Sequence, residues 1–330
     1  MAGKKTRPPL KSTFCNCLNK GNIMKIQSAY FAMLVTAITM GCASVSTTQT
    51  QSTMEYFQSL KWDVSQQGRE IDLSQYKRTF NDDFKTMDIV KDNSTPGPGA
   101  VWFSPGHGAY QATCPLRADG PFKVVDDGLR LRVEKVGKKV LGACMTSVNT
   151  KGEGFAQQYG YFEMTAQYDY KGEGIWAGFW LKSQCDYFNN GTTTRTEIDI
   201  NEFYGDNGYH PTVHLWPAAK LAPDATITKH VGHSGFKEKV APDLFAKLKV
   251  DGVVKGFHSY GGEITPEWVI MYFDRKELGR FPTVPEFKTP LFMLVSSDTR
   301  HVKPEQTVLP IDMTVKNVSA YLPIQPYKDQ

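Results

Sequence analysis

Residues 197–202 read Glu-Ile-Asp-Ile-Asn-Glu, and this stretch decides the fold. Its isoleucines alternate with polar residues, a period-two pattern typical of a β-strand with one buried face. Side chains of a strand alternate between its faces, so Glu197 and Asp199 share a face. Glu202 would lie on the opposite face of a regular strand. We expect a β-bulge at the second isoleucine or the asparagine, because one extra residue returns Glu202 to the face of the other two acids.

Three carboxylates on one face repel each other, so the arrangement points to chemistry rather than to stability. Two carboxyl groups about 5–5.5 Å apart are what a retaining glycosidase needs, one as nucleophile and one as acid/base. Clustered acids are also hard oxygen ligands, which makes Ca²⁺ an alternative. A loop rich in Asp and Asn would suit Ca²⁺ better than a strand with alternating isoleucines, and we therefore favour catalysis.

Short apolar or alternating runs separated by Gly, Pro, Asn and Asp continue along the chain from Trp62 to Tyr327. The expected strands are Leu129–Val136, Tyr159–Tyr168, Ile175–Leu181, Thr196–Glu202, Thr212–Trp216, Gly256–Tyr260, Trp268–Phe273, Leu291–Ser296 and Ile311–Tyr321. Many strands at this spacing indicate an all-β sandwich or barrel. Pro242–Leu248 is the one segment with a helix-like pattern. Without repeats or a second composition regime, residues 61–330 are predicted to form a single domain.

The N-terminus predicts export. Met24 offers a second start, so residues 1–23 are expected to be untranslated or a leader extension. Residues 24–41 have the charged start, short apolar run and small final residues of a signal peptide. Cys42 lies where bacterial lipoproteins are lipidated, and residues 42–60 form a polar Ser/Thr/Gln-rich tether. We expect an exported bacterial protein that is periplasmic, anchored at the cell surface through Cys42, or secreted.

The net charge of +4 comes from the leader and does not indicate a nucleic-acid partner. Residues 1–41 hold six Lys or Arg and no acid, and removing them leaves 32 basic and 34 acidic residues. No basic patch of the mature chain stands out, which argues against nucleic-acid binding. The mature fold keeps Cys114, Cys144 and Cys185, so at most one intramolecular disulfide forms. A Cys114–Cys144 pair and buried free thiols both remain open.

The order of motifs resembles glycoside hydrolase family 16. Segments similar to that family are Tyr159–Met164, Gly172–Leu181 with its Ile-Trp-Ala-Gly-Phe-Trp-Leu, Glu197–Glu202, His210–Trp216, Phe257–Tyr260, Trp268–Asp274 and Val315–Tyr321. Glu197–Glu202 matches the bulged E-x-D-x-x-E form of the family's catalytic strand. Ala177-Gly178 replaces the usual Pro-Ala, and Arg275 stands where Gly is common.

The resemblance implies a β-jelly roll of two curved antiparallel sheets, as in concanavalin A-like lectins and glucanases. Glu197 then matches the nucleophile, Asp199 the helper and Glu202 the general acid/base. Neighbouring negative charge raises the pKa of whichever acid ionises last, so the cluster can keep one proton in the site. No cofactor is required, although family members sometimes carry a structural Ca²⁺, for which Asp82 and Asp83 are weak candidates.

Aromatic residues are the candidates for sugar binding, because aromatic rings stack on the apolar faces of sugars. Trp176 occupies the family's leading Trp position, and Trp180 shares its face of the strand. His214 and Trp216 share a face of the following strand, where His214 can contact the acids or a sugar hydroxyl. Trp102 is a weaker candidate, on a loop. Core packing is the alternative for each Trp.

We predict a monomeric retaining endo-β-glycosidase that acts on a polysaccharide, first of all a β-1,3- or mixed β-1,3/1,4-glucan. The same chemistry on an algal galactan (agar, porphyran or carrageenan) is the alternative, because Asn201 and the His210–Trp216 strand depart from a typical laminarinase. A transglycosylase would have the same signature. A non-catalytic glycan-binding module is the alternative of a different class, since a fold does not imply catalysis.

Overall fold

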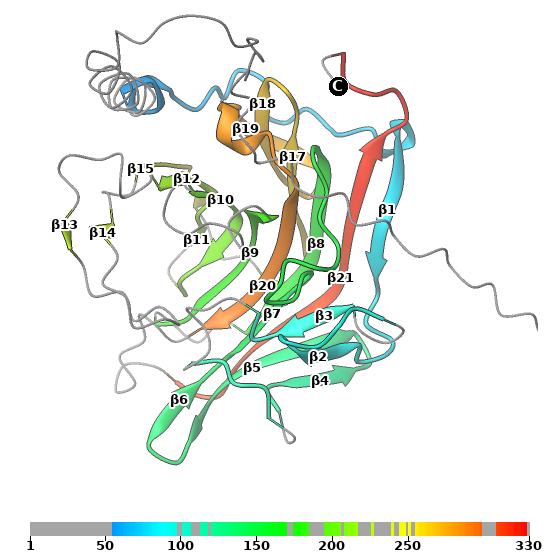
Figure 1. The fold of residues 1–330 in the computed structure, drawn as a ribbon, viewed down its shortest axis with the longest axis vertical. Coiled ribbons are helices and arrows are strands. Elements are labelled where there is room, and N and C mark those ends of the chain that lie inside the picture. The colour runs from blue at the N-terminus through cyan, green and yellow to red at the C-terminus, as the bar shows by residue number, and fades with distance from the viewer. Residues whose placement is uncertain are drawn as a thin grey trace, which may run out of the picture.

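Two large, curved β-sheets dominate the chain in the computed structural model (Figure 1). The structure describes residues 55–97, 101–106, 113–117, 120–169, 174–184, 195–205, 208–216, 226–227, 239–240, 244–248, 250–251, 255–298 and 308–328. Within these ranges almost all regular structure is β, which confirms the all-β prediction, and the two sheets form the expected jelly-roll sandwich.

The first sheet has nine strands, and its centre joins distant parts of the chain. Its order is β19 (Lys276–Pro282), β18 (Trp268–Phe273), β17 (His258–Ile264), β8 (Gly160–Tyr168), β21 (Ile311–Pro323), β5 (Gly128–Val136) and β4 (Phe122–Val125). Off this path, β1 (Tyr76–Asp82) pairs with β21 and β6 (Lys139–Leu141) pairs with β5. The last strand, β21, therefore lies beside the first (Figure 1).

The second sheet has eight strands and carries the acidic hexapeptide. Its order is β15 (Leu244–Lys247), β12 (Thr212–Trp216), β10 (Arg195–Phe203), β9 (Trp176–Ser183), β20 (Leu291–Asp298), β7 (Ala143–Thr146), β3 (Trp102–Ser104) and β2 (Ile89–Lys91). The smaller elements are β11 (Gly208–Tyr209) paired with β16 (Val250–Asp251), β13 (Thr226–Ile227) paired with β14 (Lys239–Val240), the 3₁₀ turns η1 (Leu73–Gln75) and η4 (Pro285–Phe287), and a short helix at residues 55–59.

The main core fills the space between the sheets, because alternate residues of each strand are apolar. On β8 these are Phe162, Met164 and Ala166, and on β9 they are Ala177, Phe179 and Leu181. The intervening residues of β9 lie on the other face of the second sheet, together with the acids of β10. A fixed core on one face thus determines which side chains reach the opposite face.

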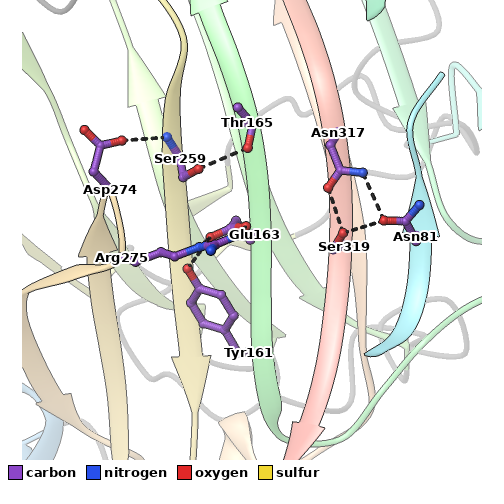
Figure 2. A network of polar contacts seen from close by, with 9 residues as sticks. All are labelled: Asn81, Tyr161, Glu163, Thr165, Ser259, Asp274, Arg275, Asn317 and Ser319. Atoms are coloured by element: carbon purple, nitrogen blue, oxygen red, sulfur yellow. Dashed lines mark hydrogen bonds and ion pairs between the residues drawn. The ribbon is translucent and has the colours of Figure 1, made fainter. Parts of the chain in front are cut away.

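The outer face of the first sheet holds a partly buried ion pair (Figure 2). Arg275 reaches across β17 and donates two hydrogen bonds of 2.9 Å each to Glu163, whose side chain is only 2% exposed. The Tyr161 hydroxyl donates a third bond of 2.8 Å to the same carboxylate. Gly261, opposite Glu163 on β17, leaves the space that this network needs, because a Cβ there would overlap the Tyr161 hydroxyl.

Three features differ from or limit the sequence predictions. The helix-like pattern of Pro242–Leu248 was misleading, because residues 244–247 form β15 at the edge of the second sheet. Phe57 falls in the predicted tether yet is buried, with its ring 5.5 Å from that of Phe281. The proposed leader (residues 1–41), Cys42 and Cys185 all lie outside the described residues. Among the helices of the described residues, none has the length and hydrophobicity to span a membrane.

Candidate active site

The predicted bulge is present in β10. The pairing of β10 with β9 shifts register between Asp199 and Asn201. Ile200 packs in the main core, and Asn201 also points there, donating a hydrogen bond to the hydroxyl of buried Tyr168. With two successive residues directed inward, Glu202 returns to the opposite face. The structure therefore brings Glu197, Asp199 and Glu202 onto one face of the second sheet, as predicted.

Glu202 is buried and held by two neighbouring strands. The indole Nε1 of Trp176 on β9 donates a 2.9 Å hydrogen bond to Glu202 Oε1. The Thr212 hydroxyl on β12 lies 3.2 Å from Glu202 Oε2 and also 3.2 Å from the carbonyl oxygen of His210. Because an indole N–H can only donate, Glu202 Oε1 accepts this hydrogen bond.

Asp199 lies between the other two acids and is almost completely buried, at 3% exposure. Burial, followed by the negative charges of Glu202 and Glu197, raises the pKa of Asp199 well above its usual range. Contact with His214, whose Nε2 lies 3.0 Å from Asp199 Oδ2, lowers the pKa in part. The neutral, protonated form of Asp199 is therefore favoured more than in an exposed aspartate.

Glu197 is the most accessible of the three acids, with 21% of its side chain exposed. Lys182 stands directly opposite it on β9, with Nζ 3.8 Å from Glu197 Oε2. On the other side, His214 is its register partner on β12. Sequence reasoning missed Lys182, although the two-residue period that relates Trp176 to Trp180 also places residue 182 on that face.

Glu197, Asp199 and His214 could together hold a metal ion, because one ligand atom from each lies within 4.8 Å of the others. The imidazole nitrogen makes this set better suited to zinc or another transition metal than to Ca²⁺, which prefers oxygen ligands only. The same atoms face each other across the hydrogen-bonded strands β10 and β12, so the cluster does not need a metal to be assembled.

The candidate sugar-binding aromatics divide into different environments. Trp176 is partly exposed beside Glu202, consistent with a place in a cleft. Trp180 is buried, donates to Ser296 Oγ at 3.2 Å, and packs in an apolar cluster with Cys114, Cys144, Val148, Phe292 and Leu294. Trp180 is thus held by packing and by this hydrogen bond, and its role in sugar binding stays a prediction. The backbone of Trp216 pairs with Arg195 on β10, but its side chain lies outside the described residues.

Trp102 is a core residue, which corrects its prediction as a subsite residue on a loop. It belongs to β3, is fully buried, and packs edge-on against Phe80. Its indole Nε1 donates to Asp82 at 2.8 Å, and Asp82 also accepts the backbone N–H of Phe84. Asp83 instead pairs with Lys85 at 2.8 Å. Each of the two Ca²⁺ candidates thus has its own protein partner.

Cys114 and Cys144 are both buried, and they are not joined to each other by a disulfide. The open question of a disulfide is thereby answered in favour of apolar packing, since both sulfur atoms belong to the cluster around Trp180.

A second aromatic group near Glu202 was not anticipated. Tyr204, directly after β10, lies edge-on to Trp176 with ring centroids 6.1 Å apart. It also stacks on His210 at 4.8 Å. Tyr204 thus contacts both His210 and Trp176, and Trp176 is the ring that binds Glu202. Alternation could not identify Tyr204, because it follows the bulge and the end of the strand.

Comparisons with known proteins agree on the family of this fold. A model described as "Glycosyl hydrolases family 16" matches residues 115–289. The chain is 27% identical over 247 residues to the endo-1,3-1,4-beta-glycanase EglC of Rhizobium meliloti (strain 1021), covering 68% of this chain and 47% of that protein. The chain thus spans about half the length of the curated relatives it matches.

Solved structures share the fold at lower identity. The laminarinase catalytic domain of Thermotoga maritima MSB8 superimposes with a TM-score of 0.52 and 18% identity, over 76% of this chain and all of that one. A kappa-carrageenase of Zobellia galactanivorans gives 0.54 and 17%, over 78% of this chain and all of that one. At these identities the similarity concerns the fold, and it does not distinguish a glucan from a galactan.

Proposed function

Because this chain belongs to glycoside hydrolase family 16, we propose that it hydrolyses internal β-linkages of a polysaccharide with retention of configuration. A β-1,3- or mixed β-1,3/1,4-glucan is the proposed substrate, since a curated relative that is 27% identical is named an endo-1,3-1,4-beta-glycanase. One observation carries the proposal: the bulge in β10 places three acids on one face of the sheet. Such a cluster of like charges serves no structural purpose.

In the first proposed step, a Glu197 oxygen attacks the anomeric carbon while Glu202 gives a proton to the departing glycosidic oxygen. In the second, Glu202 takes a proton from water, the water oxygen attacks the same carbon, and the bond to Glu197 breaks. The partly exposed position of Glu197 supports its role in attack. The bonds from Trp176 and Thr212 support Glu202 as the fixed proton carrier.

Asp199 is proposed to hold the proton that the three acids cannot all lose. A protonated carboxyl beside Glu197 can donate a hydrogen bond to it, which favours the ionised nucleophile. His214 keeps Asp199 in place from the neighbouring strand. Because the charges of Glu202 and Glu197 both act on Asp199, its ionisation depends on theirs.

The test is hydrolysis of laminarin, lichenan, agarose and kappa-carrageenan, followed by sizing of the products and NMR of the first anomer released. We expect oligosaccharides from laminarin or lichenan, released as the β-anomer. Cleavage of the galactans alone would assign the algal substrate instead, and an α-anomer would exclude retention. Longer products at high acceptor concentration would indicate a transglycosylase.

Glu197→Gln tests the catalytic assignment against a glycan-binding module. We expect this variant to lose turnover by at least a thousandfold while it still binds the polysaccharide in affinity electrophoresis. Glu267→Gln is the matched control, because Glu267 is exposed in the turn before β18. Binding without cleavage by the unaltered protein would support the binding module.

A further inference from the structure

Lys182 is buried beside the proposed nucleophile, on the strand next to it. Only 6% of its side chain is exposed, and it faces Glu197 directly in the register between β9 and β10. Its other register partner, on β20, is the fully buried Phe292. Lysine is seldom buried without a partner of opposite charge, because its desolvation is costly. The Glu197 carboxylate, 3.8 Å away, is such a partner.

The charges around Glu197 are unequal on its two sides. On one side, His214 on β12 contacts Asp199, the deeply buried acid on the same strand as Glu197. Arg195 precedes Glu197 by two positions on the same strand. Among the described residues, Lys182 is the one lysine or arginine with an ion pair to any of the three acids. Of the three acids, Glu197 is therefore the one with which Lys182 forms an ion pair.

We propose that Lys182 is a positioning residue that stabilises the Glu197 carboxylate and thereby speeds its departure in the second chemical step. The inference rests on the proposed function. In the first step the Glu197 oxygen bonds to the anomeric carbon, the bond to the leaving oxygen breaks, and Glu202 supplies the proton, so the carboxylate becomes a neutral ester.

The second step regenerates the charge that Lys182 stabilises. Water bonds to the anomeric carbon and its proton passes to Glu202. The bond to Glu197 breaks, and both its electrons return to the carboxylate. A buried ammonium close by favours this charge as it forms, because a fixed cation in a partly dehydrated site interacts strongly with developing negative charge. Without Lys182, breakdown of the glycosyl-enzyme should be slowed more than its formation.

The test follows Lys182→Met, which keeps an unbranched side chain one heavy atom shorter and removes its charge. The probe is the 2,4-dinitrophenyl β-glycoside of the oligosaccharide that the unaltered enzyme releases from its polysaccharide. We expect a burst of about one dinitrophenolate per enzyme, then a steady rate roughly ten- to a hundredfold below that of the unaltered enzyme. Mass spectrometry of the intact protein should show the added glycosyl group.

Three comparisons separate charge from structure. Lys182→Arg should restore the steady rate and remove the burst, because it returns a cation to the position. Lys182→Gln repeats the test with a neutral polar side chain in case the Met variant folds poorly, as judged by its thermal midpoint. Lys123→Met is the matched control, since Lys123 is exposed on β4.

The outcomes distinguish this inference from the proposed function. If the unaltered enzyme turns over and both neutral variants show no burst and no covalent adduct, the role of Lys182 is refuted and the proposed function stands. If Glu197→Gln turns over like the unaltered enzyme, or the unaltered enzyme cleaves no glycan, both fall.

Discussion

The hairpin between β18 and β19 turns through Asp274 and Arg275, both in the left-handed region, with φ of 48° and 63°. Two-residue hairpin turns of this kind favour glycine at the second position. Arginine there is strained, yet its guanidinium forms the paired hydrogen bonds to buried Glu163. We predict that Arg275→Gly destabilises the protein, although glycine suits the turn better.

Two opposing contributions determine the magnitude. Removing one partner of a buried ion pair costs about 3–5 kcal/mol. Because 49% of the Arg275 side chain is exposed, water can reach the pair, and we take the lower end. Glycine in the left-handed region gains about 1 kcal/mol over an ordinary residue. The expected net loss is about 2 kcal/mol, a decrease of roughly 4–8 °C in Tm for a domain of this size.

The assay is urea denaturation at neutral pH, followed by tryptophan fluorescence, for the unaltered protein, Arg275→Gly and Arg275→Ala. Alanine loses the pair and keeps the strain, so it should be about 1 kcal/mol less stable than glycine. Glu163→Gln combined with Arg275→Gly should be less destabilised than the sum of the single changes, because no charge is left unpaired. An Arg275→Gly protein as stable as the original would refute the reasoning.

Two further predictions concern the acids. Since Asp199 has a raised pKa in the folded protein, the folded state binds the extra proton and stability falls as pH rises above the usual carboxyl range. Asp199→Asn should therefore raise Tm at pH 7, and this gain should shrink toward about pH 4. We also expect kcat to fall. An equal gain in Tm over the unaltered protein at both pH values would contradict this. Trp176→Phe keeps the ring and loses the bond to Glu202, so we expect kcat to fall roughly tenfold; an unchanged kcat with a raised KM would mean that Trp176 only stacks on the sugar.

Much of the fold and the heart of the site followed from local patterns. The alternation of Ile198 and Ile200 with acids identified a strand with one buried face, and both isoleucines do lie in the core. The bulge was predictable because Glu202 can share a face of the strand with Glu197 only if the strand contains one extra residue. A two-residue period is a local property, so it can be recognised without knowing which strands become neighbours.

The errors and omissions concern partners that are distant along the chain. Nothing near Trp102 or Trp180 indicates that their indoles meet Asp82 and Ser296, which are brought together only by strand pairing. The same limit hid Lys182, whose importance depends on its register with Glu197. The segment around β15 looked helical because a short edge strand of four residues gives too little sequence for the period to be recognised.

The bulge also makes the spacing of the proposed catalytic groups depend on side chains that never meet a substrate. Ile200 fits against Gly262 of the first sheet, where even a methyl group would come within 2.7 Å of its Cγ1. The bond from Asn201 to Tyr168 fixes the next residue in the same interior. Deleting one residue between Asp199 and Glu202 would point Glu202 into the hydrophobic interior, whereas enlarging Gly262 would push on the strand from behind. Residues packed between the two sheets should therefore affect the activity of natural or designed versions of this chain as much as residues in the cleft do.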